Sequence, residues 1–463
     1  MVSPFAGALD RTLERLRTAF RDTARGAREA VGAPLRPDLP DDDIPRLKGR
    51  IDACLEGRGG ETARRARAAE LGQAYLALSP AGHKKFLTTL AHDYGLTRDA
   101  AMQAVEQWRA SKAPPRALTK ALESPAVCLL AEFVGVPQGV KFVVDLRAEL
   151  LALGRADPAV RALADDLRPL LGGWFDVAFL DLVRIDWRAP AALLEKLVAY
   201  EAVHAIRSWR DLKNRLDSDR RCFAFFHPRM PDEPLIFVEV ALVDGMAGDV
   251  QRLLDPKAPT RDPATANTAI FYSISNCQQG LAGVSFGNFL IKRVATELQK
   301  ELPNLKDFVT LSPIPGLRGH IDARPANDVD GVLTASEIAD LATVVDKTTG
   351  AAAVRLLLDR PKWWEVPAVD KILRPILTRL AAQYLTATDK GRALDRVAHF
   401  HLGNGAIVER LNGLGDTSAN GLKQSYGMMV NYRYKLSDVD ANHEAYASGK
   451  VVASREVRAA AKD

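Results

Sequence analysis

Two side chains suited to proton transfer stand in distinctive local settings, far apart in the chain. Ser312 lies in the segment LSPIPG at 311–316, directly after an apolar run. Its two prolines stiffen the turn and remove two backbone donors, so the turn would hold the hydroxyl in one direction. His401 precedes LGNGA at 402–406, a turn that we expect to open another helix. Imidazole is the side chain best suited to exchange protons near neutrality.

Each of these residues also has an ordinary structural explanation. A Ser-Pro turn commonly uses its hydroxyl to cap a backbone group, and most histidines are satisfied structural residues. His399 and His401 also have a spacing that would suit a metal pair, but the sequence places no third ligand, and we expect no metal site. From the residues alone, the structural explanations remain the favoured ones.

A glycine-rich loop lies between a predicted strand at 269–274 and a predicted amphipathic helix at 288–301. Glycines let the backbone approach a ligand closely, and the free amides at a helix start favour an anion such as a pyrophosphate. The same spacing also serves tight packing, which is the commoner explanation. The candidate binding positions are Ala282, Gly283, Val284, Ser285, Phe286, Gly287 and Asn288.

The elements that must position these residues divide the chain into two parts. Helical spacing of apolar residues begins with Phe5, Leu9, Leu13, Leu16 and Phe20, and recurs at 62–78, 82–92 and 97–109. Beyond residue 172, aromatic and β-branched runs predict strands at 222–226, 235–242, 269–274, 308–311 and near 428–434. The sequence therefore predicts an α+β protein with an all-α helical bundle domain at 1–172 and an α/β domain at 173–463.

Composition limits the possible functions. With 463 residues, 47% of them hydrophobic, the chain can bury two or three cores, and its net charge of +5 is far from that of a nucleic-acid binder. It has no run of about 18 apolar residues, so we expect no membrane span. The four cysteines lie far apart, which favours a reducing compartment, and acidic residues interleave the N-terminal arginines, unlike a transit peptide. We expect a cytoplasmic protein.

Several longer motifs together resemble the malonyl-CoA decarboxylase family. They are FYSISNCQQGLAGVSFGNFLIKRV at 271–294, TLSPIPG at 310–316, FHLGNGAIVERLN at 400–412 and MMVNYRY at 428–434, preceded by EAVHAIRSWRDLKNRL at 201–216 and RRCFAFFHPRMPDEPL at 220–235. The resemblance runs in the same order from about 170 to about 452. Because so many long motifs coincide, it is far more specific than any single glycine loop.

The resemblance implies a fold and an activity. The second domain would have the acetyltransferase (GNAT-like) fold with helical insertions, and coenzyme A would lie against a splayed sheet with its diphosphate on the loop at 282–288. The helical domain would serve assembly into a homotetramer, a dimer of dimers. The reaction would convert malonyl-CoA to acetyl-CoA and CO2, as a step of fatty acid metabolism. It would need no cofactor, because the thioester itself accepts the electrons.

The resemblance also assigns roles to residues. Ser312 matches the catalytic serine, His401 the proton donor, Tyr434 an active-site tyrosine and His227 a histidine needed for activity. Tyr434 is equally explained as a core aromatic of a strand, and His227 as a loop histidine.

The chain also departs from the family pattern. It carries Ser285 where the family has a glutamate, and Glu409 and Gly413 where tryptophans are familiar. Two other functions therefore stay open, an acyltransferase of the same fold and a non-enzymatic sensor that binds malonyl-CoA.

Overall fold

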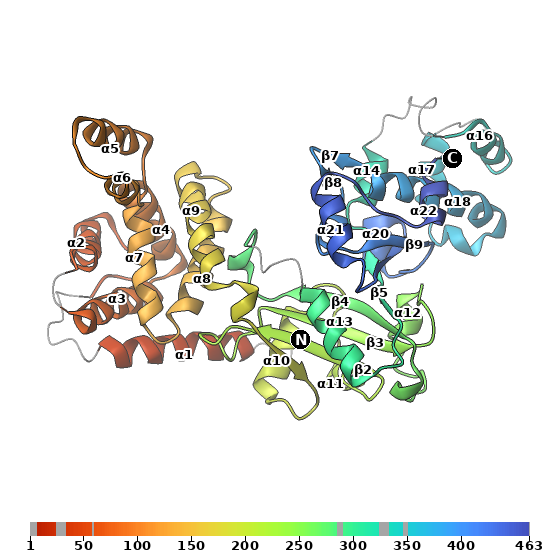
Figure 1. Cartoon of the computed structure of the whole chain (residues 1–463), viewed down its shortest axis with the longest axis horizontal. Helices are drawn as coiled ribbons and strands as arrows, with labels where there is room; N and C mark the ends of the chain where they lie inside the picture. The colour runs from red at the N-terminus through yellow and green to blue at the C-terminus, as the bar shows by residue number, and fades with distance from the viewer. Residues whose placement is uncertain are drawn as a thin grey trace.

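The chain folds into a helical part and a sheet part, which lie side by side in Figure 1. The computed structural model describes residues 7–24, 34–57, 60–284, 290–323, 333–345 and 351–462. The helical part comprises α1 (Gly7–Ala24), α2 (Ile44–Leu55), α3 (Glu61–Leu76), α4 (Pro80–Tyr94), α5 (Arg98–Ala110), α6 (Pro115–Ala121), α7 (Pro125–Glu132), α8 (Gly139–Leu153) and α9 (Pro158–Trp174). The predicted helices at 62–78, 82–92 and 97–109 are confirmed, and α9 runs two residues past the predicted boundary at 172.

Local sequence sets where these helices begin. The Ser79 hydroxyl accepts the Gly82 amide, and Pro80 occupies the first helical position of α4, where its missing N–H costs nothing. Thr97 accepts the Ala100 amide in the same way at the start of α5. These caps satisfy backbone donors that the helix itself leaves unpaired.

The C-terminal part of the apolar face of α1 packs inside the chain. Leu16 and Phe20 are buried, and α1 packs mainly against α3. The Thr12 hydroxyl donates to the Glu233 carboxylate at 2.9 Å, which links α1 to the sheet part. Phe5 lies outside the described residues. Leu16 and Phe20 are therefore covered within one chain, whereas Leu13 of the same face is 37% exposed.

The sheet part is built on one eight-stranded sheet in the order β1-β2-β3-β4-β5-β10-β6, with β9 also paired to β10. The strands are β1 (Asp181–Ile185), β2 (Arg220–Phe226), β3 (Ile236–Val243), β4 (Thr268–Asn276), β5 (Asp307–Thr310), β6 (Ser312–Pro313), β9 (Ile407–Asn412) and β10 (Met429–Tyr434), with a separate hairpin of β7 (Thr388–Asp389) and β8 (Arg392–Ala393). The five strands predicted from the sequence are confirmed.

Strands β4 and β5 form the parallel pair at the centre of the sheet. Their last paired residues are Phe271 and Thr310; β5 ends there, while β4 continues to Asn276. The two strands therefore part at this point. The connection between them is a loop followed by α13 (Leu290–Glu301), whose residues Ile291, Val294 and Leu298 are buried in the same core as Phe271.

Further helices surround the sheet, several of them as insertions between strands. They are α10 (Ala191–Tyr200), α11 (Trp209–Arg215), α12 (Val250–Leu253), α14 (Leu317–Asp322), α16 (Ala335–Ala342), α17 (Ala351–Leu358), α18 (Pro367–Thr386), α19 (Arg396–Gly403), α20 (Ala419–Ser425), α21 (Val439–Ala447) and α22 (Arg455–Ala460). In Figure 1 the helices nearest the C-terminus, drawn in blue, gather over one end of the sheet. Among the described residues, no helix is both long and apolar enough to cross a membrane.

One local prediction is wrong. The turn after His401 does not open a helix; His401 lies in the last turn of α19, and the chain then enters strand β9. Gly405 makes this reversal with a φ of +80°, a conformation that side-chain-bearing residues rarely adopt, and it lies against the Val439 carbonyl. The β-branched Ile407 and Val408 that follow suit a strand.

Candidate active site

Ser312 lies at a break in the sheet. Strand β10 pairs with β5 at Phe308 and Val309, and with β6 at Ser312 and Pro313. Between these pairs, side chains replace the regular backbone ladder. The Tyr432 amide donates to Thr310 Oγ1 at 3.1 Å, and the Asn431 side-chain amide donates to the Thr310 carbonyl at 2.7 Å. The chain is thus fixed on both sides of the hydroxyl.

His401 is brought to the same place by α19. Asp395 caps the start of this helix, and its carboxylate accepts the Val397 and Ala398 amides at 2.8 and 3.0 Å. The same carboxylate accepts the Gly316 amide at 3.3 Å, four residues after Ser312. Asp395 therefore joins the start of the histidine helix to the turn that carries the serine.

The structure brings three of the four predicted catalytic residues together. Ser312 Oγ lies 3.1 Å from His401 Nε2, and the Tyr434 hydroxyl lies 2.8 Å from His401 Nδ1. The Tyr432 ring stacks on the imidazole with a centroid distance of 4.4 Å. All of these side chains are buried, and His401 is only 2% exposed. The imidazole is thus held through both nitrogens and one face.

Burial determines the charge state of this cluster. It lowers the pKa of His401 to about 3, because an imidazolium would lose its hydration there. It raises the pKa values of Tyr432 and Tyr434 well above the ordinary phenol value. At neutral pH the imidazole is therefore neutral and both phenols keep their protons.

The glycine-rich loop is held by the helical part of the chain. Arg147 of α8 is 1% exposed, and its guanidinium donates to the Ala164 carbonyl at 2.7 Å, to the Ala282 carbonyl at 3.0 Å and to the Gly280 carbonyl. Gly280 itself touches α8 so closely that a Cβ there would lie 1.7 Å from the Val144 carbonyl oxygen. The helical domain thus fixes the first half of the loop.

A cavity of about 820 Å³ opens between this loop and α19. Ala282, Gly283 and Val284 line it, whereas Ser285, Phe286, Gly287 and Asn288 lie outside the described residues. Its opposite wall is formed by residues of the β7–β8 hairpin, α19 and α21: Lys390, Gly391, Arg392, His399, Phe400, Gly403, Asn404, His443, Tyr446 and Ala447. Ser312 and His401 are not part of this wall; His401 lies next to Phe400 on the same helix and faces β10.

Two histidines considered from the sequence lie apart from the cluster. His227, at the end of β2, packs on Phe175 at 4.9 Å and accepts the Arg229 amide, and β3 and β4 separate its strand from β5. Its catalytic role stays a prediction. His399 Nδ1 contacts the Tyr446 hydroxyl at 2.7 Å, so it and His401 have different partners. Across the described residues, no group of three potential metal ligands is present.

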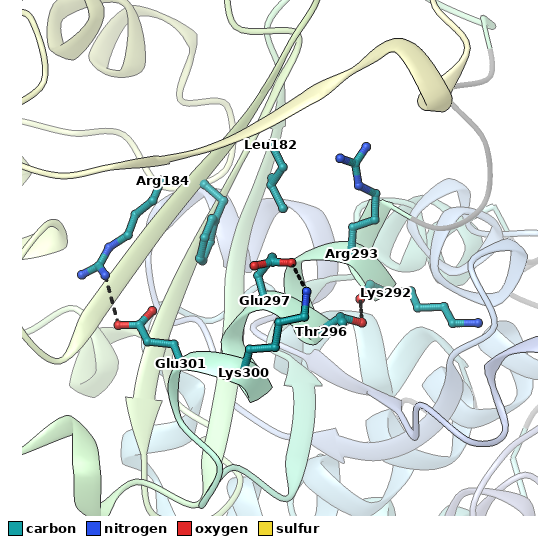
Figure 2. A pocket seen from close by; sticks show the side chains of 9 residues that line it. Leu182, Arg184, Lys292, Arg293, Thr296, Glu297, Lys300 and Glu301 are labelled. Atoms are coloured by element: carbon teal, nitrogen blue, oxygen red, sulfur yellow. Dashed lines mark hydrogen bonds and ion pairs between the residues drawn. The ribbon is translucent and has the colours of Figure 1, made fainter.

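A second groove, of about 1020 Å³, lies between α13 and the strands β1 and β2, and it shares no lining residue with the cluster (Figure 2). Its cations already have partners. Arg184 pairs with Glu301 at 3.0 Å and Lys300 with Glu297 at 2.8 Å. We therefore assign no ligand to this groove.

Sequence reasoning missed several contributors to the site: Arg147, Thr310, Asp395 and Tyr432. For two of them a signal was present. Thr310 precedes Ser312 by two residues and Tyr432 precedes Tyr434 by two, the spacing that places strand side chains on one face. Arg147 gives no comparable signal, because its acceptors in the loop lie more than 130 residues away.

The parallel pair that parts beyond Phe271, with a loop and α13 between its strands, defines a GNAT-like α/β domain, carried here behind a helical domain. Sequence profiles agree with this division: that of the malonyl-CoA decarboxylase C-terminal domain matches residues 178–463, and that of the N-terminal domain matches residues 94–175. The chain belongs to the malonyl-CoA decarboxylase family. The resemblance stated from the motifs is therefore confirmed.

Individual relatives agree. The chain is 40% identical over 330 residues to the mitochondrial malonyl-CoA decarboxylase of Anser anser anser, an alignment covering 69% of this chain and 65% of the goose protein. The corresponding protein of Rattus norvegicus is 39% identical over 69% of this chain and 67% of its own length. The crystal structure of malonyl-CoA decarboxylase from Rhodopseudomonas palustris superposes with a TM-score of 0.81 at 42% identity, covering 90% of this chain and 99% of that one.

Proposed function

We propose that this chain decarboxylates malonyl-CoA to acetyl-CoA and CO2. The observation that carries the proposal is the buried contact of Ser312 with His401 at 3.1 Å, completed by Tyr434 at 2.8 Å. Serine and histidine lie 89 residues apart in the sequence, and the fold brings them together in a buried cluster. Family membership supplies the substrate class.

The reaction requires the protein mainly to position the substrate and a few hydrogen-bond and proton donors. Loss of CO2 leaves an electron pair on the α-carbon, which the thioester carbonyl accepts as an enolate. The site must hold the carboxylate out of the carbonyl plane, donate hydrogen bonds to the enolate oxygen and deliver one proton to carbon. Preorganised donors to such an oxygen are worth about 3–4 kcal/mol.

Ser312 and His401 have different roles in this reaction. Ser312 orients the malonyl carboxylate and takes part in proton exchange. His401 supplies the proton for the α-carbon from Nε2–H, as a neutral imidazole, since burial lowers its pKa to about 3. Neutral imidazole serves as a donor to an enolate in other enzymes. A solvent proton restores the imidazole after acetyl-CoA leaves, so each turnover consumes one proton.

The cavity beside the loop is the proposed coenzyme A site. Backbone groups of Gly283 and Val284 would face the diphosphate, and Lys390 and Arg392 on the opposite wall supply positive charge for phosphate groups. The cavity volume of about 820 Å³ suits a large ligand. We propose that the reaction uses no cofactor, because the thioester itself accepts the electron pair as an enolate.

One assay separates the proposal from its rivals. With malonyl-CoA alone, decarboxylation yields acetyl-CoA and CO2, which mass spectrometry and bicarbonate detection follow. An acyltransferase would instead release free coenzyme A only when an amine is added, and a sensor would bind malonyl-CoA without consuming it. Absence of acetyl-CoA from a folded preparation would refute the proposal.

The His401→Asn variant tests the site itself. It should bind coenzyme A nearly as the wild type does, while CO2 release falls about a hundred- to ten-thousandfold, the usual effect of losing a general acid. Unchanged turnover would remove His401 from the mechanism. Rapid-quench mass analysis of the wild type distinguishes a serine acyl intermediate from direct proton exchange.

We further propose a cytoplasmic homotetramer that acts in fatty acid metabolism. The four cysteines are free, which suits a reducing compartment. The relatives from goose and rat are named as mitochondrial proteins, so cell fractionation decides the compartment. Light scattering on the purified chain tests the tetramer, and a monomer at micromolar concentration would contradict it.

A further inference from the structure

The hydrogen bonds around Ser312 have a direction that depends on Thr310. Ser312 Oγ donates to Thr310 Oγ1 at 2.8 Å, and the Tyr432 amide donates to the same oxygen at 3.1 Å. Thr310 is fully buried. Its two acceptor lone pairs are therefore both occupied, one by the backbone of β10 and one by the catalytic hydroxyl.

This contact decides the protonation of His401. A serine hydroxyl has one proton, and here it points to Thr310. The 3.1 Å contact between Ser312 Oγ and His401 Nε2 must then have the imidazole as donor. A neutral imidazole has one N–H, so Nδ1 is the acceptor and receives the Tyr434 hydroxyl proton at 2.8 Å.

The opposite order conflicts with the contact between Ser312 and Thr310, in which Ser312 is the donor. If Ser312 donated to Nε2, the Nδ1–H would point to the Tyr434 oxygen. The Tyr434 hydroxyl proton would then have no acceptor, because His401 is its hydrogen-bond partner in the described part of the chain. In the order that runs from Tyr434 to Thr310, it is the Thr310 hydroxyl proton that has no acceptor among the described residues. The direction of the hydrogen bond from Ser312 to Thr310 therefore decides between the two orders.

We propose that Thr310 is a positioning residue that fixes the proton order Tyr434 O–H to His401 Nδ1, His401 Nε2–H to Ser312 and Ser312 O–H to Thr310. In a hydrolase triad the serine donates to Nε2 and becomes a nucleophile. Here the order is reversed, so His401 does not activate Ser312. Resting on the proposed function, this makes Ser312 a carrier of the His401 proton rather than a site of acylation.

Two measurements test the assignment. The first is the 15N spectrum of the wild-type chain labelled at histidine, with the His401 signals identified by their loss in His401→Gln. The proposal expects a protonated Nε2 and an unprotonated Nδ1; a protonated Nδ1 overturns it. This measurement needs no variant of Thr310 and no turnover.

The second is the reaction of Ser312 with diisopropyl fluorophosphate, in which serine oxygen displaces fluoride from phosphorus and the hydroxyl proton passes to His401. Thr310→Val keeps the shape but removes the acceptor, so the hydroxyl is free to turn to Nε2, and labelling should accelerate about tenfold, the equivalent of one lost hydrogen bond. Thr310→Ser should restore the slow wild-type rate. Ser312→Ala identifies the labelled site.

Wild-type labelling as fast as that of Thr310→Val, with both proteins folded by circular dichroism, overturns the proposal. Neither measurement involves malonyl-CoA. A chain that releases no CO2 but shows a protonated Nε2 would therefore refute the proposed function and leave the proton order standing. A chain that releases CO2 but shows a protonated Nδ1 would refute the proton order and leave the proposed function standing.

Discussion

The contact between Gly280 and α8 gives a direct test of whether the helical domain positions the glycine-rich loop. In Gly280→Ala, the new Cβ would lie 1.7 Å from the Val144 carbonyl oxygen, while real Cβ atoms keep at least 3.0 Å. The loop or the helix must therefore move by more than about 1 Å, since a packed interior offers no free space. Arg147, which donates to the Gly280 and Ala282 carbonyls, would be displaced with them.

The expected magnitude follows from this displacement. A shift of about 1 Å near a site costs about a hundredfold in kcat/KM. The loss should appear mainly in KM, because Ala282, Gly283 and Val284 line the cavity proposed for coenzyme A, whereas Ser312 and His401 are held by other elements. Overpacking costs about 1–3 kcal/mol of stability, which leaves a typical domain folded at 25 °C.

A matched control is available in α14. A Cβ added at Gly319 would have no atom within 4 Å, so Gly319→Ala adds the same methyl group without a clash. It should keep wild-type kcat/KM and gain about 0.5–1 kcal/mol of stability, the usual effect of alanine in a helix. Steady-state assays of acetyl-CoA formation compare the three proteins. A Gly280→Ala enzyme that is folded and within twofold of the wild type would refute the idea that α8 positions the loop.

Three further predictions concern the buried cluster. Tyr434→Phe removes the donor to His401 Nδ1, so kcat should fall about 5- to 150-fold, the effect of 1–3 kcal/mol, with KM nearly unchanged in the same assay. Asp395→Ala removes the cap of α19 and should cost about 1–2 kcal/mol in urea unfolding, whereas Asp395→Asn, itself a good cap, should lose only part of this. The pKa of His401 is lowered in the folded chain, so the unfolded state binds more protons below its ordinary pKa of about 6.5, and stability is lost as pH falls through this window. Between pH 7 and pH 5 this group should account for about 2 kcal/mol of lost unfolding free energy, and His401→Gln should show a correspondingly smaller loss.

The sequence predicts most elements of this fold because their signals are local. Caps such as Thr97 and runs such as 222–226 and 308–311 lie within one element, and the structure confirms them. Strand β1 (181–185) escaped prediction because it is a short edge strand whose residues are largely exposed. The strand at 407–412 was missed for a different reason: the glycines before it suggested a helix start, whereas Gly405 reverses the chain.

The site was harder to predict than the fold. The period of two in strands could have paired Thr310 with Ser312 and Tyr432 with Tyr434, since residues two apart share a face. The meeting of these strands with His401 depends on tertiary contacts, above all the Asp395 carboxylate that joins the turn at Gly316 to the start of α19. The contact of Arg147 with the loop is also tertiary, and it gives the helical domain a part in the site that composition does not reveal.

The break between β5 and β6 explains why these side chains can form a chain of hydrogen bonds at all. In a regular ladder, the Tyr432 amide would donate to a backbone carbonyl of the neighbouring strand, and Thr310 Oγ1 would have no fixed orientation. Here the pairing of β10 with β9 is irregular between Asn431 and Tyr432, and the Tyr432 amide donates to the Thr310 hydroxyl instead. Thr310 then has one lone pair left, and Ser312 is the donor that reaches it. The interruption of the ladder at Thr310 therefore allows a side chain to set the direction in which the Ser312 hydroxyl points.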